Sequence, residues 1–100
     1  MIASSLYFFE PVEKEVICDY TFPEEDVLQD TSLKRKRIAE LVRGMAYGNM
    51  YRNKMRIFFE DDTSKKVVET TIWGITDDKV VLKSNTYIPI NRIYPSGEDF

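Results

Sequence analysis

The side chains in this sequence that are best suited to binding are the cationic and aromatic ones between residues 31 and 56. This stretch holds eight bases and one acid, a net charge of +7, in a chain whose overall charge is −3. Arginine and lysine neutralise phosphates, and exposed tyrosine rings stack on nucleic-acid bases. The candidate nucleic-acid-binding residues are Arg35, Lys36, Arg43, Tyr47, Tyr51, Arg52 and Arg56.

Acidic residues precede this basic stretch and oppose its charge. Residues 1–30 hold eight acids and one base, a net charge of −7. Such a segment can pack over the basic stretch of its own chain, or acidic and basic surfaces of different subunits can meet in a homo-oligomer. The sequence pI of about 5.0 argues against a dedicated nucleic-acid binder, because such domains are usually basic. Three hypotheses therefore stay open for the partner: RNA or another nucleic acid, another protein, or a second copy of the chain.

Catalytic and metal-binding chemistry has little support in the sequence. The chain has no histidine and a single cysteine. These counts remove histidine-based triads, most zinc sites and any intrachain disulfide. The acidic clusters at 24–26, 61–62 and 77–78 are typical of solvated turns and helix starts. We expect no enzyme activity, no metal ion, no cofactor and no small-molecule ligand.

The length and the apolar runs of the chain suggest its organisation and location. No run approaches the ~20 apolar residues of a membrane span, and the N-terminus lacks the basic region of a signal peptide. We expect a cytoplasmic protein with no membrane contact. One hundred residues are the size of one domain. Its expected parts are an acidic extended segment (1–30), a basic helix (31–48) and an antiparallel meander (54–95).

One predicted helix positions most of the candidate binding residues. Good N-cap residue types occupy positions 30–32, and Gly48-Asn49 offers a left-handed stop. These signals predict a helix over about 32–47, with its basic side chains off the apolar face. Apolar residues recur at spacings of three and four, as a buried helix face requires. They are Ile38, Leu41, Val42 and Met45.

The remainder of the chain has the pattern of strands. Side chains alternate with a period of two from residue 54 onward. Cys18 is expected as a half-buried strand residue and Trp73 as a core or sheet-packing residue, while Gly74 marks a bulge or bend and Pro89 an edge strand. The predicted class is α+β, with one main helix and a mainly antiparallel, barrel-like sheet. Its predicted strands lie near 15–22, 54–60, 67–74, 79–84 and 87–93.

The second half of the chain resembles a known type of small barrel. Residues 77–93, Asp-Asp-Lys-Val-Val-Leu-Lys-Ser-Asn-Thr-Tyr-Ile-Pro-Ile-Asn-Arg-Ile, read as a turn, an apolar strand, a polar turn and a strand ending in isoleucine. With a helix ahead of the strands, residues 54–95 resemble the last strands of SH3-like or Sm-like barrels, including bacterial Sm-like RNA chaperones. The resemblance implies a ring-forming, RNA-binding protein. It assigns no RNA-contact residue, because residues 87–91 stand where Sm-like proteins often carry a histidine or an Arg-Gly segment.

Overall fold

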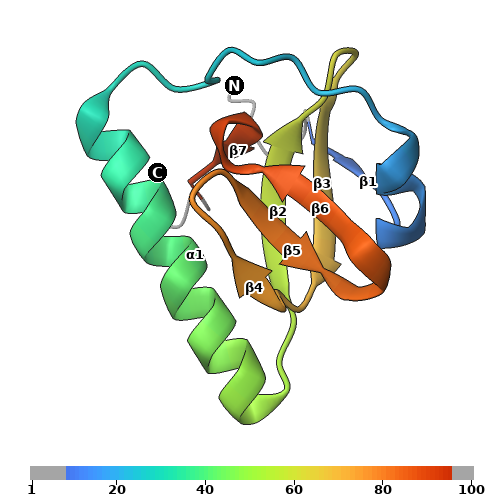
Figure 1. Cartoon of the computed structure of the whole chain (residues 1–100), viewed down its shortest axis with the longest axis vertical. Helices are drawn as coiled ribbons and strands as arrows, with labels where there is room; N and C mark the ends of the chain where they lie inside the picture. The colour runs from blue at the N-terminus through green and yellow to red at the C-terminus, as the bar shows by residue number, and fades with distance from the viewer. Residues whose placement is uncertain (1–8, 96–100) are drawn as a thin grey trace, which may run out of the picture.

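The computed structural model describes residues 9–95, and it confirms the predicted α+β class. Figure 1 shows the long helix along one flank of the strands and the first 3-10 helix on the opposite flank. The helices are η2 (Lys14–Asp19), α1 (Thr31–Tyr51), η3 (Lys83–Asn85) and η4 (Ile90–Arg92). The strands are β1 (Glu10–Pro11), β2 (Met55–Glu60), β3 (Lys65–Thr70), β4 (Gly74–Ile75), β5 (Lys79–Leu82), β6 (Thr86–Pro89) and β7 (Ile93–Tyr94).

Helix α1 begins where its capping residues predict. The Asp30 carboxylate accepts hydrogen bonds from the backbone N–H groups of Ser32 and Leu33, at 2.7 and 3.2 Å. These bonds satisfy two of the four N–H groups that have no partner at the start of a helix. The first turn of α1 is thus fixed by local chemistry. Within residues 9–95, no helix is long and apolar enough to cross a bilayer.

The end of α1 differs from the prediction. The helix continues past Gly48 and Asn49 to Tyr51, and the left-handed cap is Arg52, with a φ of 58°. Gly48 serves packing instead, because a Cβ at that position would lie 2.8 Å from the carbonyl oxygen of Asn53. The glycine lets the last helical turns approach the chain that returns toward β2.

The face of α1 that packs against the strands also differs from the predicted stripe. Leu41 is buried and Met45 packs against the core, but Ile38 and Val42 are 40% and 46% exposed. Gly48 is buried on the same face as Leu41. The face that packs on the strands therefore carries Leu41, Met45 and Gly48, and the other half of the predicted apolar stripe faces outward.

The strands form two sheets, and the barrel-like sheet expected from the sequence is not closed into a barrel. A four-stranded sheet has the order β1-β3-β2-β7, and a three-stranded sheet has the order β4-β5-β6. All described pairs are antiparallel except the short β1–β3 pair. The buried core includes Ile57 and Phe59 of the first sheet and Val80 and Ile88 of the second. Pro89 lies on β6, which is an edge strand as predicted.

Two predicted strands are interrupted in the structure. The predicted strand 67–74 stops at Thr70, and the chain enters the other sheet only at Gly74. The predicted strand 87–93 breaks at η4, so Ile93 pairs with β2 rather than continuing along β5. These two breaks divide the predicted meander between two sheets.

The predicted strand 15–22 is wrong. Residues 14–19 form the 3-10 helix η2, in which Ile17 is buried and Cys18 is exposed. The chain pairs with β3 just before this segment, through Glu10 and Pro11 of β1. The Val12 N–H donates to Val67 O at 2.9 Å and extends the contact made by β1. The segment therefore buries one isoleucine through a local helix and leaves its thiol in solvent.

Candidate nucleic-acid interface

Four of the predicted binding residues lie together at the C-terminal half of α1. Arg43, Tyr47 and Tyr51 are spaced four apart and therefore follow one row of the helix surface, and Arg52 is its cap. Each of the two tyrosines is 57% exposed. Their ring centroids are 4.7 Å apart at an interplanar angle of 48°. We refer to Arg43, Tyr47, Tyr51 and Arg52 as the helix patch.

The acidic N-terminal segment neutralises only part of the basic stretch. The buried Arg37 guanidinium donates to both carboxylate oxygens of Asp26 at 2.9 Å, and Lys34 lies 3.9 Å from the same carboxylate. The Arg37 hydrogen bond holds the pKa of Asp26 below its usual range. For Arg37 and Lys34, this arrangement agrees with the hypothesis that the acidic segment packs over the helix.

The arginines of the helix patch are not engaged in this way. Within residues 9–95, neither Arg43 nor Arg52 has a carboxylate within 4 Å. The same holds for Arg35, two turns toward the start of the helix. Lys36 differs, since its ammonium is 4.0 Å from the Glu40 carboxylate. The helix patch thus carries two cations whose charge the described part of the chain leaves uncompensated.

Arg56 does not join the helix patch. It extends from β2 opposite Glu69 of β3, and both line a groove of about 500 Å³ on the four-stranded sheet. Glu13 lines the same groove. Lys54 lines it as well, so two carboxylates balance the two cations of this groove, and none of its lining residues belongs to α1. The structure therefore separates Arg56 from the candidates on α1.

A shallow depression lies directly beside the helix patch. Its volume is about 190 Å³, below the ~300–1,000 Å³ of typical small-molecule sites. Lys54 lines it together with Arg43 and Tyr47. Lys54 belongs to the basic stretch of the sequence but is not among the predicted binding residues, because nothing in the sequence indicated that it would lie beside Tyr47. Its place next to Tyr47 adds a third cation to this surface.

Two exposed aromatic residues lie outside the predicted site. Trp73 was predicted to pack in the core or on the sheet, and this is wrong because it is 61% exposed. Tyr87 of β6 is 53% exposed. Strand alternation shows which residues share a face, but it does not show whether another layer covers that face. No signal in the sequence separated these two rings from core residues.

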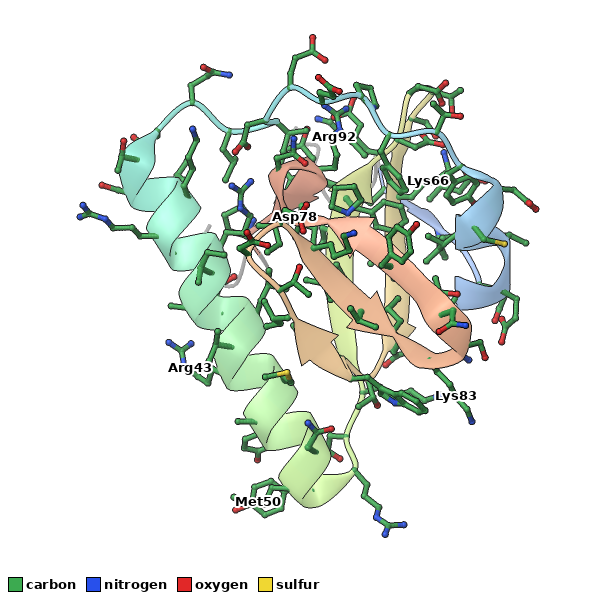
Figure 2. All side chains as sticks on the ribbon, viewed as in Figure 1. Arg43, Met50, Lys66, Asp78, Lys83 and Arg92 are labelled. Atoms are coloured by element: carbon green, nitrogen blue, oxygen red, sulfur yellow. The ribbon has the colours of Figure 1, made fainter. Side chains whose placement is uncertain are left out.

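Buried ionic groups gather at the other end of the molecule. Figure 2 places Lys66 and Arg92 at the end opposite Met50 and Lys83. The Lys66 ammonium donates to Asp61 at 2.9 Å, and the Arg92 guanidinium donates to backbone carbonyls of Glu25 and Glu60 at 2.8 and 3.0 Å. These bonds hold turns and chain crossings in place, so we assign them to the fold.

Two titratable groups near these buried cations, Tyr94 and Asp61, have shifted pKa values. Burial and a hydrogen bond to Glu60 raise the pKa of Tyr94. Burial alone would raise the pKa of Asp61, but hydrogen bonds from Ser64, Lys66 and Thr63 outweigh it and lower the pKa to about 2. Across the described part of the chain, no group of three or more His, Cys, Asp or Glu residues is placed to hold a metal ion.

The fold and this surface define a small α+β domain with a basic, aromatic helix end. Comparison with known proteins finds no matching family model, no matching curated protein and no matching solved structure. The resemblance of residues 54–95 to SH3-like and Sm-like proteins therefore stays a prediction. The functional argument depends on the surface itself.

Proposed function

We propose that this protein is a non-catalytic binding module that binds single-stranded nucleic acid, RNA in particular, through the helix patch. The observation that supports this most is the pair of adjacent, exposed rings of Tyr47 and Tyr51. Arg43 lies one turn before Tyr47 and Arg52 is the cap that follows Tyr51, and neither arginine has a carboxylate partner in residues 9–95. Aromatic rings accept bases of any sequence, and neighbouring cations hold the backbone. A role on RNA agrees with the cytoplasmic location expected from the sequence.

The proposed binding depends on the local charge of the helix patch and not on the net charge of the protein. The chain carries a net charge of −3, so long-range attraction does not concentrate RNA around it. Affinity has to come from stacking, worth ~1–3 kcal/mol per base, and from a few phosphate contacts. We therefore expect weak, sequence-tolerant binding that falls as salt rises.

The test is a titration of a fluorescently labelled 12-nucleotide oligo(U), followed by anisotropy at 50 and 200 mM salt. Binding is expected at 50 mM salt and should be weaker at 200 mM. The logarithm of the binding constant should fall with the logarithm of the salt concentration, with a slope of about −0.7 per phosphate contact. The double change Arg43→Gln and Arg52→Gln should reduce the magnitude of this slope by about 1.4, because two phosphate contacts are lost. The matched control is Arg56→Gln, in the separate groove, which should leave the slope unchanged. Absence of binding at 50 mM salt, or binding with no salt dependence, contradicts the proposal.

A second candidate function is docking of a protein, including a second copy of this chain. Ile38 and Val42, one turn apart on α1, are exposed, as is Met50 near the end of the helix, and exposed apolar patches mark interaction sites. Sedimentation across a salt series tests self-association, which the change Val42→Asp should reduce. A monomer at all salt concentrations that binds no partner in pull-downs counts against this candidate.

A further inference from the structure

The structure contains a second exposed aromatic surface, on the three-stranded sheet. Its first member is Trp73, whose position results from a β-bulge. The Trp73 N–H donates to Val81 O at 2.8 Å, although Gly74 is the registered partner of Val81. Two residues of one strand thus oppose one residue of the other, which is the pattern of a bulge. A bulge redirects a side chain, and here the indole is left in solvent.

The alternation of β5 and β6 defines which face of the sheet this is. Val80 and Ile88 point into the core, so Val81 and its registered partner Tyr87 point outward. Trp73 opposes Val81 from the other side. Neighbouring strands are ~4.8 Å apart, so the two rings are carried on strands about 10 Å apart. One outward face therefore presents two large, exposed rings.

Cations accompany these rings. The Lys79 ammonium lies 4.8 Å from the centre of the Tyr87 ring, and Lys83 is exposed at the end of β5 (Figure 2). The nearby acids Asp77 and Asp78 line a different groove, which they share with Arg37. We refer to Trp73, Tyr87, Lys79 and Lys83 as the sheet platform.

The sheet platform and the helix patch lie at the same end of the molecule. A Cβ added at Gly48 would lie 3.7 Å from the Thr71 side chain, so the last turns of α1 abut a residue two positions before Trp73. In Figure 2, Arg43 of the helix patch and Lys83 of the sheet platform lie in the same half of the molecule, on its two opposite flanks. A flexible strand leaving Tyr51 and Arg52 can therefore continue toward Trp73.

We propose that the sheet platform is a second contact site for the same single-stranded nucleic acid, with bases stacked on Trp73 and Tyr87 and phosphates held by Lys79 and Lys83. This inference rests on the proposed function. Charge complementarity favours this ligand, since two cations and two stacking rings match phosphates and bases. The consequence is a ligand that spans both surfaces, so that affinity depends on its length.

The test uses the fact that Trp73 is the only tryptophan in the chain. Titration with oligo(U) of 4 and 12 nucleotides is followed by Trp73 fluorescence and, with labelled oligonucleotide, by anisotropy. Quenching of Trp73 by the 12-mer is expected. The change Trp73→Ala should weaken 12-mer binding roughly tenfold, and Trp73→Phe should restore most of the affinity because it keeps an aromatic ring.

The control variant is Val16→Ala, an exposed apolar residue on η2, which should leave oligonucleotide affinity within about twofold of the unmodified protein. Circular dichroism and the urea midpoint check that each variant is folded. Normal 12-mer binding with no change in Trp73 fluorescence, and with Trp73→Ala within twofold, overturns the sheet platform but leaves the helix patch intact. No binding by either readout at 50 mM salt overturns both proposals.

Discussion

Arg37 and Asp26 form a two-point ion pair that joins α1 to the segment preceding it. Each of the two nitrogen–oxygen distances is 2.9 Å, and the same guanidinium donates to Ile93 O at 3.0 Å. One side chain thus connects the helix, the acidic segment and β7. Basic residues of one helix thus have different roles, because Arg37 is buried in this ion pair while Arg43, six residues later, is exposed to solvent.

Removing the charge of Asp26 should destabilise the protein. With Asp26→Asn, the Arg37 guanidinium stays buried beside a neutral amide, and loss of one partner of a buried pair costs about 3 kcal/mol. The free energy of unfolding from urea denaturation measures this. Asp30→Asn is the matched control, since asparagine caps a helix as well as aspartate does. Equal urea midpoints for the two variants would show that the pair does not stabilise the fold.

Asp61 should make stability depend on pH in the acidic range. Its pKa is about 2 in the folded protein, against an ordinary value of 3.8. A lowered pKa stabilises the folded state above the unfolded pKa, and this contribution is lost as pH falls from about 4 toward 2. Between pH 6 and pH 3 the loss due to Asp61 is about 1 kcal/mol.

Urea denaturation of the protein and of Asp61→Asn at these two pH values measures that loss. The variant should be less stable at pH 6 and should lose about 1 kcal/mol less than the unmodified protein on acidification. Asp62→Asn, at the exposed neighbouring position, is the control. An identical pH dependence with and without the Asp61 carboxylate contradicts the assignment.

The two glycines of α1 should respond differently to alanine. At Gly48 the added Cβ meets the backbone oxygen of Asn53 at 2.8 Å, and backbone cannot move aside cheaply. At Gly44 it meets the Met55 side chain, which is flexible. Overpacking costs ~1–3 kcal/mol, whereas alanine gains ~1 kcal/mol in helix propensity over glycine. We expect Gly48→Ala to lower thermal stability and Gly44→Ala to be nearly neutral, and the opposite order would refute this packing.

The thiol of Cys18 should react in the folded protein. Cys18 is exposed on η2, where its sulfur lies 3.6 Å from Glu15 O. An aromatic disulfide reagent should therefore label one thiol per chain without denaturant, at a rate close to that in urea. A half-buried strand position would instead protect the thiol. Strong protection under native conditions would favour the strand predicted from the sequence over the 3-10 helix.

The helix patch could be predicted largely from the sequence, because its members are close along the chain. A spacing of four places Arg43, Tyr47 and Tyr51 on one row of any α-helix. Arg56 shows the limit of this reasoning. It is four residues from Arg52, but the chain leaves the helix between them, so proximity in sequence no longer implies proximity in space.

The sequence by itself determined the elements that depend on local interactions. Asp30 caps α1 through its own neighbours, and the period-two pattern of 55–60 and 79–82 suffices for β2 and β5. The α+β class follows from these elements.

Tertiary structure decided the features that depend on a distant partner. Residues 14–19 have strand-like composition, but they form the 3-10 helix η2, which buries Ile17 in the core without pairing with a sheet. Trp73 also depends on a distant partner. It belongs to an alternating pattern in the sequence, but a bulge against Val81 redirects its side chain into solvent. Periodicity encodes which side chains share a face, whereas covering that face requires contacts between segments far apart in the chain.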